Sequence, residues 1–287
     1  MIAIGCSAIL LSFPALAASP PAWEKNVTTD ARGSFPNPRP IVATYDFGWS
    51  GLVAATARID FGKSDDRLQL EASGGTVGPV RALWKFDTHH RALADPTTLR
   101  PISMHQVDEF RDKTVTTDVV FRRGVLERIR SDTKSRKPPT PKTFRFAGVV
   151  FDMHSALLYL RSQPLREGDV YRVVVYPATN AYLATLTVVG HPTVTVGAGT
   201  FPSIKLDLQL YKVGKKRELE PHKKFRRASV WVSDDADRLL LRAEASIFIG
   251  TVFAELQSAG FPTSSPNDSE PAARDKPAAA AGGLVAP

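Results

Sequence analysis

Apolar and aromatic residues recur at every second position over long stretches of this chain. In residues 41–49 all the odd positions are apolar or aromatic, and the same alternation runs through residues 53–61, 68–72, 204–210 and 243–249. Because successive side chains of a β-strand point to opposite faces of a sheet, this pattern predicts strands with one apolar and one polar face. Strands of this kind form antiparallel sheets that pack one face against a core.

Further strands are expected where β-branched and aromatic residues cluster, in segments 80–93, 102–111, 115–130, 143–150, 170–176, 181–189, 193–196 and 228–233. Several of these strands are long and follow one another through short turns, which favours a strongly curved antiparallel sheet, a half-barrel or barrel. One main helix is expected after Asp152, a good helix-capping residue, and before Pro164. The predicted fold class is therefore all-β, with one main helix against a curved sheet.

The two ends of the chain differ from this β-rich part. Residues 1–17 form a short apolar run that ends in Ala-Leu-Ala, which is typical of a secretory signal peptide rather than a transmembrane helix. Residues 18–40 are proline-rich and are expected to be an extended linker. Residues 258–287 are rich in alanine, proline and serine, a composition typical of a disordered tail. One β-rich domain is predicted over residues 41–257.

The signal peptide predicts export to the periplasm. Cys6 is the only cysteine of the chain, and cleavage after Ala17 would remove it. The mature protein would then have no thiol for catalysis, a disulfide or a zinc site. The alternative is a true start further upstream, with residues 3–6 as a poor lipobox and the protein anchored by a lipid.

Three stretches of the chain carry a resemblance to a known family. The first is FDMHSALLYLR at residues 151–161 with PLREG at 164–168, the second is GTFPSIK at 199–205, and the third is WVSDD at 231–235 with Arg238. Together they resemble an exported bacterial family catalogued as domain of unknown function 3108, over roughly the whole predicted domain. The resemblance implies an envelope location and a β-rich fold, and it brings no known catalytic residue. The pattern is also similar to the half-barrel lipoprotein carriers, which hold acyl chains against a curved sheet.

The sequence contains no pattern typical of a catalytic, cofactor or metal site. No two of its six histidines have the spacing of a zinc-binding helix, and the adjacent His89 and His90 would point to opposite faces of a strand. We therefore expect no cofactor, no metal and no catalytic residue.

Asp234, Asp235 and Asp237 allow two interpretations. They could bind calcium, or serve as the acids of a periplasmic hydrolase that acts on an envelope polymer. They could also form a turn between two strands in which Arg238 pairs with an aspartate. We favour the turn, because the chain has no glutamate or glycine at the offsets that a calcium loop requires.

Positive charge is concentrated in two segments. Residues 122–145 contain nine Lys or Arg and two acids, and residues 212–227 contain eight and two, so their net charges are +7 and +6. On one rim of the sheet they would attract an anionic membrane surface, lipopolysaccharide or an acidic envelope protein. They could also be solvated hairpin tips. Nucleic acid is not expected as a partner, because the chain is exported and has no nucleic-acid-binding motif.

Five aromatic residues are the candidate ligand contacts. Tyr45, Phe47 and Trp49 share one strand face, and Trp84 and Phe86 share another. They could line a groove for an acyl chain, or they could belong to a filled core, because alternation is the same in both cases. The predicted function is that of a non-catalytic periplasmic cell-envelope protein that binds a lipid or other apolar ligand. The alternatives are the hydrolase and a structural partner of an outer-membrane complex.

Overall fold

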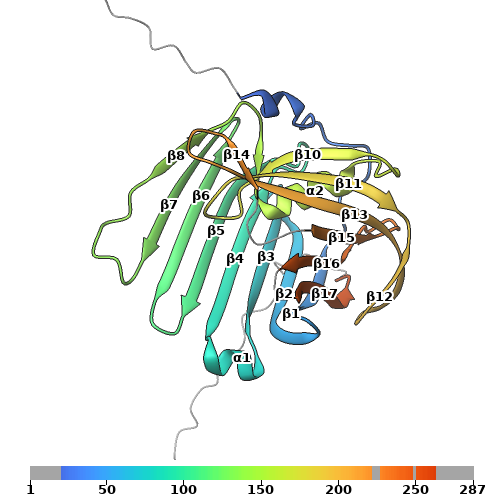
Figure 1. Ribbon diagram of the computed structural model, residues 1–287, viewed down its shortest axis with the longest axis horizontal. Helices are drawn as coiled ribbons and strands as arrows, with labels where there is room; N and C mark the ends of the chain where they lie inside the picture. Colours follow the sequence, from blue (N-terminus) through green and yellow to red (C-terminus); the bar gives the residue numbers. More distant parts are fainter. Residues whose placement is uncertain (1–20, 222–226, 248–249, 263–287) are drawn as a thin grey trace, which may run out of the picture.

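The computed structural model describes residues 21–221, 227–247 and 250–262. The predicted signal peptide and nearly all of the predicted tail lie outside these residues. The described strands form one large, strongly curved sheet (Figure 1). The first nine strands are β1 (Ile41–Trp49), β2 (Leu52–Ser64), β3 (Arg67–Thr76), β4 (Phe86–Ala94), β5 (Pro101–Phe110), β6 (Thr114–Arg122), β7 (Val125–Asp132), β8 (Lys142–Arg145) and β9 (Val150–Phe151).

The other strands are β10 (Val170–Val175), β11 (Tyr182–Gly190), β12 (Thr193–Val196), β13 (Gly199–Val213), β14 (Leu219–Pro221), β15 (Arg227–Ser233), β16 (Leu240–Ile247) and β17 (Gly250–Gly260). The helices are the 3-10 helix η1 (Ala22–Asn26), α1 (Gly78–Leu83) and α2 (Met153–Ser162).

The pairing of the strands gives an open sheet. From one edge to the other the order is β8-β7-β6-β5-β4-β3-β2-β1-β17-β16-β15-β13-β11-β10-β9, and β12 and β14 pair with the two ends of β13. All pairs are antiparallel except β9 with β10. Among the strand pairs of the described residues, none joins β8 to β9 or β10. The prediction of a β-rich chain with a strongly curved antiparallel sheet is confirmed, and the sheet is curved without being closed.

Helix α2 begins at Met153, as the capping signal predicts. The Asp152 carboxylate accepts hydrogen bonds from the backbone N–H groups of His154 (2.7 Å) and Ser155 (2.8 Å). In return the Ser155 hydroxyl accepts one from the Asp152 N–H at 3.1 Å. This reciprocal capping box satisfies N–H groups that a helix start otherwise leaves unpaired. Figure 1 shows α2 within the curve of the sheet, closer to β10 and β11 than to α1.

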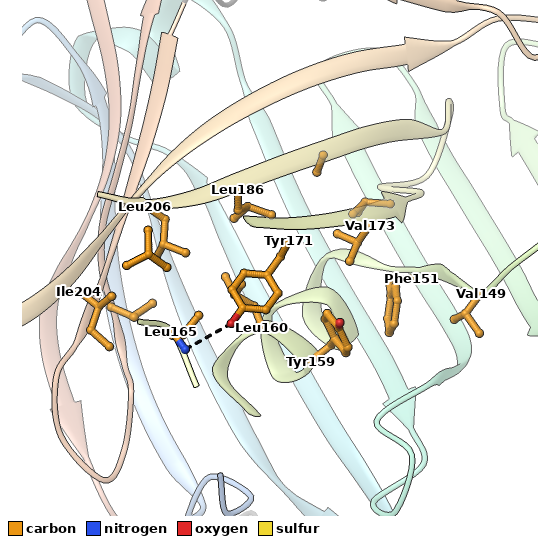
Figure 2. Packing of buried hydrophobic residues seen from close by; sticks show 14 residues of the cluster. Val149, Phe151, Tyr159, Leu160, Leu165, Tyr171, Val173, Leu186, Ile204 and Leu206 are labelled. Carbon is orange, nitrogen blue, oxygen red and sulfur yellow. Dashed lines mark hydrogen bonds between the residues drawn. The ribbon is translucent and has the colours of Figure 1, made fainter. Parts of the chain in front are cut away.

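The inner face of the sheet beside α2 is a filled core. Figure 2 shows Tyr159 and Leu160 of α2 packed among side chains of β10, β11 and β13, such as Leu186 and Leu206, all of them at most 8% exposed. The Leu165 N–H donates a hydrogen bond to the Tyr171 hydroxyl at 3.3 Å and fixes the chain that follows the helix. This part of the interior is therefore closed by side chains.

The structure differs from three of the predicted strands. The predicted strand 143–150 is interrupted, because β8 ends at Arg145 and β9 begins only at Val150. The predicted strand 80–93 begins with helix α1, because Pro79 suits the first turn of a helix, and β4 starts only at Phe86. The predicted strand 115–130 is a hairpin, since Gly124 adopts a φ of +70° and turns the chain between β6 and β7. Strand β17 runs to Gly260, three residues past the predicted end of the domain.

Residues 27–40 run as an extended strap across α2 and the edge of β10. The Thr28 N–H donates to the Arg172 carbonyl at 2.8 Å, and the Arg172 N–H donates to the Thr28 hydroxyl at 2.8 Å. The Tyr159 hydroxyl of α2 donates to the Thr29 carbonyl at 2.8 Å. Gly33 passes so close to the end of α2 that an added Cβ would lie 2.0 Å from the Ser162 carbonyl oxygen. The strap therefore fixes α2 against the sheet.

Candidate functional site

The contacts of α2 identify the concave face of the sheet. His90 of β4 lies against His154 of α2, with ring centroids 4.7 Å apart, and Leu158 of α2 packs in one cluster with Phe61 of β2 and Leu68 of β3. Directly opposite residues of an antiparallel pair share a face. Following the opposite residues from strand to strand gives the other residues on this concave face. From β1 to β6 they include Phe47, Ala55, Ala57, Gly74, Phe86, Thr88, Gln106, Asp108, Phe110 and Thr117.

Part of the concave face carries mainly small side chains. Ala55 and Ala57 of β2, Ala72 and Gly74 of β3 and Ala254 of β17 all lie on it, and each remains partly exposed. We call these five residues the alanine-rich surface. Their short side chains leave an apolar patch that no described side chain fully covers. Apolar surface of this kind gains free energy when a ligand removes it from water.

Exposed apolar side chains gather at one end of this surface. The turn from β1 to β2 and helix α1 lie side by side, because the Val77 N–H bonds to the Ala54 carbonyl at 2.9 Å. Together they expose six large apolar residues, which we call the open rim: Phe47, Trp49, Leu52, Val53, Leu83 and Trp84. Leu83 is 87% exposed and Trp84 55%. Exposed apolar residues gathered in this way mark an interaction site.

The five aromatic residues predicted as ligand contacts fall into two places. Tyr45 belongs to the core: it is 6% exposed, its hydroxyl donates to the Leu240 carbonyl at 2.8 Å, and burial raises its pKa. Phe47 and Trp49 lie on the open rim. Trp84 stacks on Phe86 with centroids 5.5 Å apart at the same rim.

The structure thus brings four of the five aromatic residues to one end of the sheet. Leu52 and Leu83 of the rim were not among the residues predicted to contact a ligand. Leu52 follows Gly51 at a hairpin tip, where a polar residue is usual. An apolar residue at this position is the sequence signal that could have pointed to the rim.

A strip of polar side chains interrupts the apolar concave face on β4 and β5. The Thr88 hydroxyl donates to the Asp108 carboxylate at 2.8 Å, and the Gln106 amide donates to both Asp108 oxygens at 2.8 and 2.9 Å. His90 lies in the next row, opposite Gln106, with His154 against it. We call these five residues the polar strip. All five are partly buried.

The two histidines of the polar strip are neutral at pH 7. Burial lowers the pKa of His90 to about 4, and the neighbouring His154 lowers it further. Burial also lowers the pKa of His154 to about 4. The Nε2 atom of His90 is buried and has no hydrogen-bond partner among the described residues. Each neutral imidazole offers one donor and one acceptor.

The three aspartates of the alternative hydrolase form the predicted turn between β15 and β16. Asp237 pairs with Arg39 at 2.6 Å, and this hydrogen-bonded pair lowers the pKa of Asp237. An oxygen of Asp235 accepts from the Asp237 N–H at 2.9 Å and from the Arg238 N–H at 3.0 Å. Asp234 pairs with His191 at 2.8 Å. Each carboxylate therefore has a structural partner.

Arg238 itself differs from the prediction. Its guanidinium donates to the carbonyls of Arg161, Gln163 and Pro164 at the end of α2 instead of pairing with an aspartate side chain. The reason is that the turn places Arg238 next to the last carbonyls of the helix, which are unpaired acceptors.

The β7–β8 loop of the first basic segment and Arg217 of the second lie at opposite ends of β8. Lys134 of the β7–β8 loop pairs with Asp112 in the β5–β6 turn. In the same turn the Arg111 guanidinium donates to the Ala82 carbonyl of α1 at 2.6 Å. The β7–β8 loop is therefore connected through the β5–β6 turn to the open rim. In the other segment Arg217 pairs with Glu24, whose second oxygen accepts from the Ala147 N–H at 3.1 Å, beyond the other end of β8. Among the described residues of the two basic segments, only the β7–β8 loop of the first is therefore linked to the rim. His222 and residues 223–226 lie outside the described residues.

Within the described part of the chain, no three or more His, Cys, Asp or Glu residues are grouped so that they could hold a metal ion. None of the helices there has the length and apolar character to cross a membrane.

Comparisons with known proteins agree with the fold. A family model described as "Protein of unknown function (DUF3108)" matches residues 44–257. Among curated proteins, none matches the chain. A solved β-barrel-like protein of the family DUF1849 from Brucella abortus superposes with a TM-score of 0.54 at 12% identity, covering 79% of this chain and 99% of that one. This likeness supports the curved β-barrel-like architecture.

Two further solved structures align at lower scores. One is from Bacteroides fragilis and is described as a candidate exported protein with a YmcC-like fold; its TM-score is 0.33 at 8% identity, over 80% of this chain and 100% of that one. The other is described as a candidate lipoprotein from Parabacteroides distasonis, with a TM-score of 0.34 at 10% identity, over 81% of this chain and 100% of that one.

Proposed function

The chain belongs to the DUF3108 family of proteins of unknown function, and we propose that it binds the hydrocarbon chain of a membrane lipid in the bacterial cell envelope. The observation that supports this proposal is the alanine-rich surface, which stays partly exposed inside the curve of the sheet and continues into the open rim. The predicted signal peptide supports a periplasmic location. The protein would act by holding its ligand rather than by changing it.

The energetics allow such binding. Each buried methylene contributes about 0.8 kcal/mol, so a ten-carbon chain gains roughly 8 kcal/mol. Lost translational and rotational freedom offsets a large part of this gain. With an offset of about 4 kcal/mol, a single short chain is expected to bind with a dissociation constant on the order of 1 mM, and longer chains more tightly.

Filling the alanine-rich surface is expected to abolish lipid binding. In Ala57→Phe the new ring occupies the concave face between Tyr45 and Gly74, which lie opposite Ala57 in the neighbouring strands. Affinity for decanol, measured by isothermal titration calorimetry, should fall more than tenfold because the ring takes the place of the chain. The matched control is Ser73→Phe, an exposed position on the convex face of β3, which should bind as the unmodified protein does. Equal affinity in both variants would contradict the proposed site.

The open rim and the adjoining basic loop are the surface through which we propose that the protein docks on an anionic membrane. Tryptophan and leucine side chains insert at the boundary between lipid headgroups and acyl chains. The exposed Arg136 and Lys137 of the β7–β8 loop would lie near the lipid phosphates. Docking at the rim would bring the alanine-rich surface to the membrane from which the lipid is taken.

Removing two charges from the basic loop that adjoins the rim should weaken this docking. Basic residues near an anionic membrane contribute about 1 kcal/mol each, so the double variant Arg136→Gln/Lys137→Gln should bind vesicles rich in phosphatidylglycerol roughly thirtyfold more weakly. The control Lys215→Gln/Lys216→Gln removes the same charge from exposed positions of the other basic segment and should bind normally. Cosedimentation with vesicles at 50 mM salt measures both. Equal losses in the two variants would show that net charge, and not the rim, attracts the membrane.

A further inference from the structure

The polar strip divides the concave face into an apolar part and a hydrogen-bonding part. We infer that the bound lipid carries an uncharged, hydroxyl-rich headgroup such as a sugar, which the polar strip recognises. This inference rests on the proposed function, because the alanine-rich surface would hold the hydrocarbon chain of the same molecule. A ligand with an apolar chain and a polar head would match both parts of the face.

The strip has the hydrogen-bonding groups that suit hydroxyls. Asp108 accepts hydrogen bonds only from the uncharged Thr88 and Gln106, and no basic side chain of the described chain forms an ion pair with it. A carboxylate has about four acceptor positions in all, so capacity remains for a ligand hydroxyl. His90 and His154 in the next row are neutral, so they bring no positive charge to the strip.

The same groups disfavour charged headgroups. An anionic headgroup would be repelled by Asp108, the only carboxylate of the strip. A cationic headgroup would be attracted by Asp108, but it could accept nothing from the Gln106 amide. Polar groups that a ligand buries without a hydrogen-bond partner reduce affinity. An uncharged hydroxyl-rich headgroup avoids both losses.

An aromatic row lies beside the strip at the open rim. Phe86 and Phe110 face each other across β4 and β5 with centroids 5.2 Å apart, and Trp84 stacks on Phe86. On the same face, the next pair along these strands is Thr88 and Asp108. Aromatic rings offer an apolar surface to the C–H face of a sugar, while Asp108 and Gln106 can bond its hydroxyls. Polar groups next to an exposed aromatic ring therefore complete a site for a glycosyl headgroup.

Three probes with a chain of ten carbons, counting the carboxylate carbon of decanoate, test this inference: decyl maltoside, decanoate and decyltrimethylammonium. Each is titrated into the protein at pH 7.5, below its critical micelle concentration, and followed by calorimetry. We expect decyl maltoside to bind at least tenfold more tightly than either charged probe. Asp108→Asn keeps the shape of the side chain and removes its charge, and it should weaken maltoside binding about tenfold to a hundredfold, because hydrogen bonds to charged groups are the stronger ones.

The control variant is Asp118→Asn. It makes the same chemical change on neighbouring β6, but Asp118 is exposed on the convex face and pairs there with His105 at 2.7 Å. This variant should leave maltoside binding unchanged. Thermal unfolding shows whether Asp108→Asn destabilises the fold. If it does, Gln106→Leu is the second variant that tests the polar strip.

The outcomes separate the inference from the proposed function. If all three probes bind with similar affinity, the lipid-binding site stands and headgroup recognition is wrong. Tighter binding of decanoate or of decyltrimethylammonium would likewise overturn the assignment of an uncharged headgroup. If no decyl compound binds at all, the proposed function itself fails.

Discussion

Replacement of Arg238 by alanine is expected to lower the free energy of unfolding by about 3–5 kcal/mol. The Arg238 guanidinium is buried and donates to three carbonyls at the end of α2, those of Arg161, Gln163 and Pro164. It also lies over the ring of Phe35 in the strap at 3.6 Å. Alanine would leave these carbonyls buried without a donor, and it would loosen the joint where the helix, the strap and the β15–β16 turn meet.

Chemical denaturation followed by circular dichroism measures this loss, and thermal unfolding should shift by roughly 10 °C for a chain of this size. Arg166→Ala is the control, because Arg166 is exposed and only a few residues from the same joint. It should change stability by less than about 0.5 kcal/mol. If Arg238→Ala were as stable as the control, Arg238 would not anchor the helix.

Stability is expected to fall as the pH is lowered from about 6.5 to 4. In the folded protein the pKa values of His90 and His154 are about 4, well below the value of 6.5 for an unperturbed histidine. Between these pH values the unfolded chain binds protons that the folded chain does not, so unfolding becomes more favourable as the pH falls. Each histidine contributes at most about 3 kcal/mol to this loss, and below pH 4 its contribution is constant.

The double variant His90→Gln/His154→Gln should remove this pH dependence. Urea unfolding at several pH values between 7 and 4 measures it. Asp152 lies beside His90 and His154 and has the opposite effect on stability as the pH falls. Burial raises the pKa of its carboxyl, so protonation of Asp152 favours the folded state. Asp152 is present in both proteins, so the difference between their pH profiles isolates the histidines. Parallel profiles would mean that the imidazoles do not stay neutral in the fold.

The features that the sequence predicts well are local. The capping of α2 by Asp152 depends on residues within one turn of the chain, and the strand alternation depends on neighbours two positions apart. Helix α1 was missed because Val80, Leu83 and the aromatic residues after it also fit a strand. Here the short-range pattern is ambiguous and Pro79 decides it.

The candidate site depends on contacts between distant parts of the chain. His90 and His154 are 64 positions apart, and only the curvature of the sheet brings the helix against β4. The aromatic residues were recognised individually, but periodicity could not separate Tyr45, which lies in the core, from Trp49 on the rim. Their different burial follows from the placement of β16 and of the β12–β13 hairpin, which no local pattern encodes.

Because the two edge strands are not paired with each other in the described part of the chain, strand pairing does not fix the circumference of this sheet. In a closed barrel the number of strands and their stagger fix the circumference. Here β8 and β9 are joined by residues 146–149, and we call the boundary between these two edges the seam. The contacts across the seam come from side chains. Arg128 donates to the Tyr176 hydroxyl at 2.9 Å, and Phe144 lies against the Tyr176 ring. Among the described strands no ladder of backbone hydrogen bonds joins β8 to β9 or β10, so side-chain packing sets the width of the seam, including the buried cluster that contains Leu126, Tyr176 and Leu183.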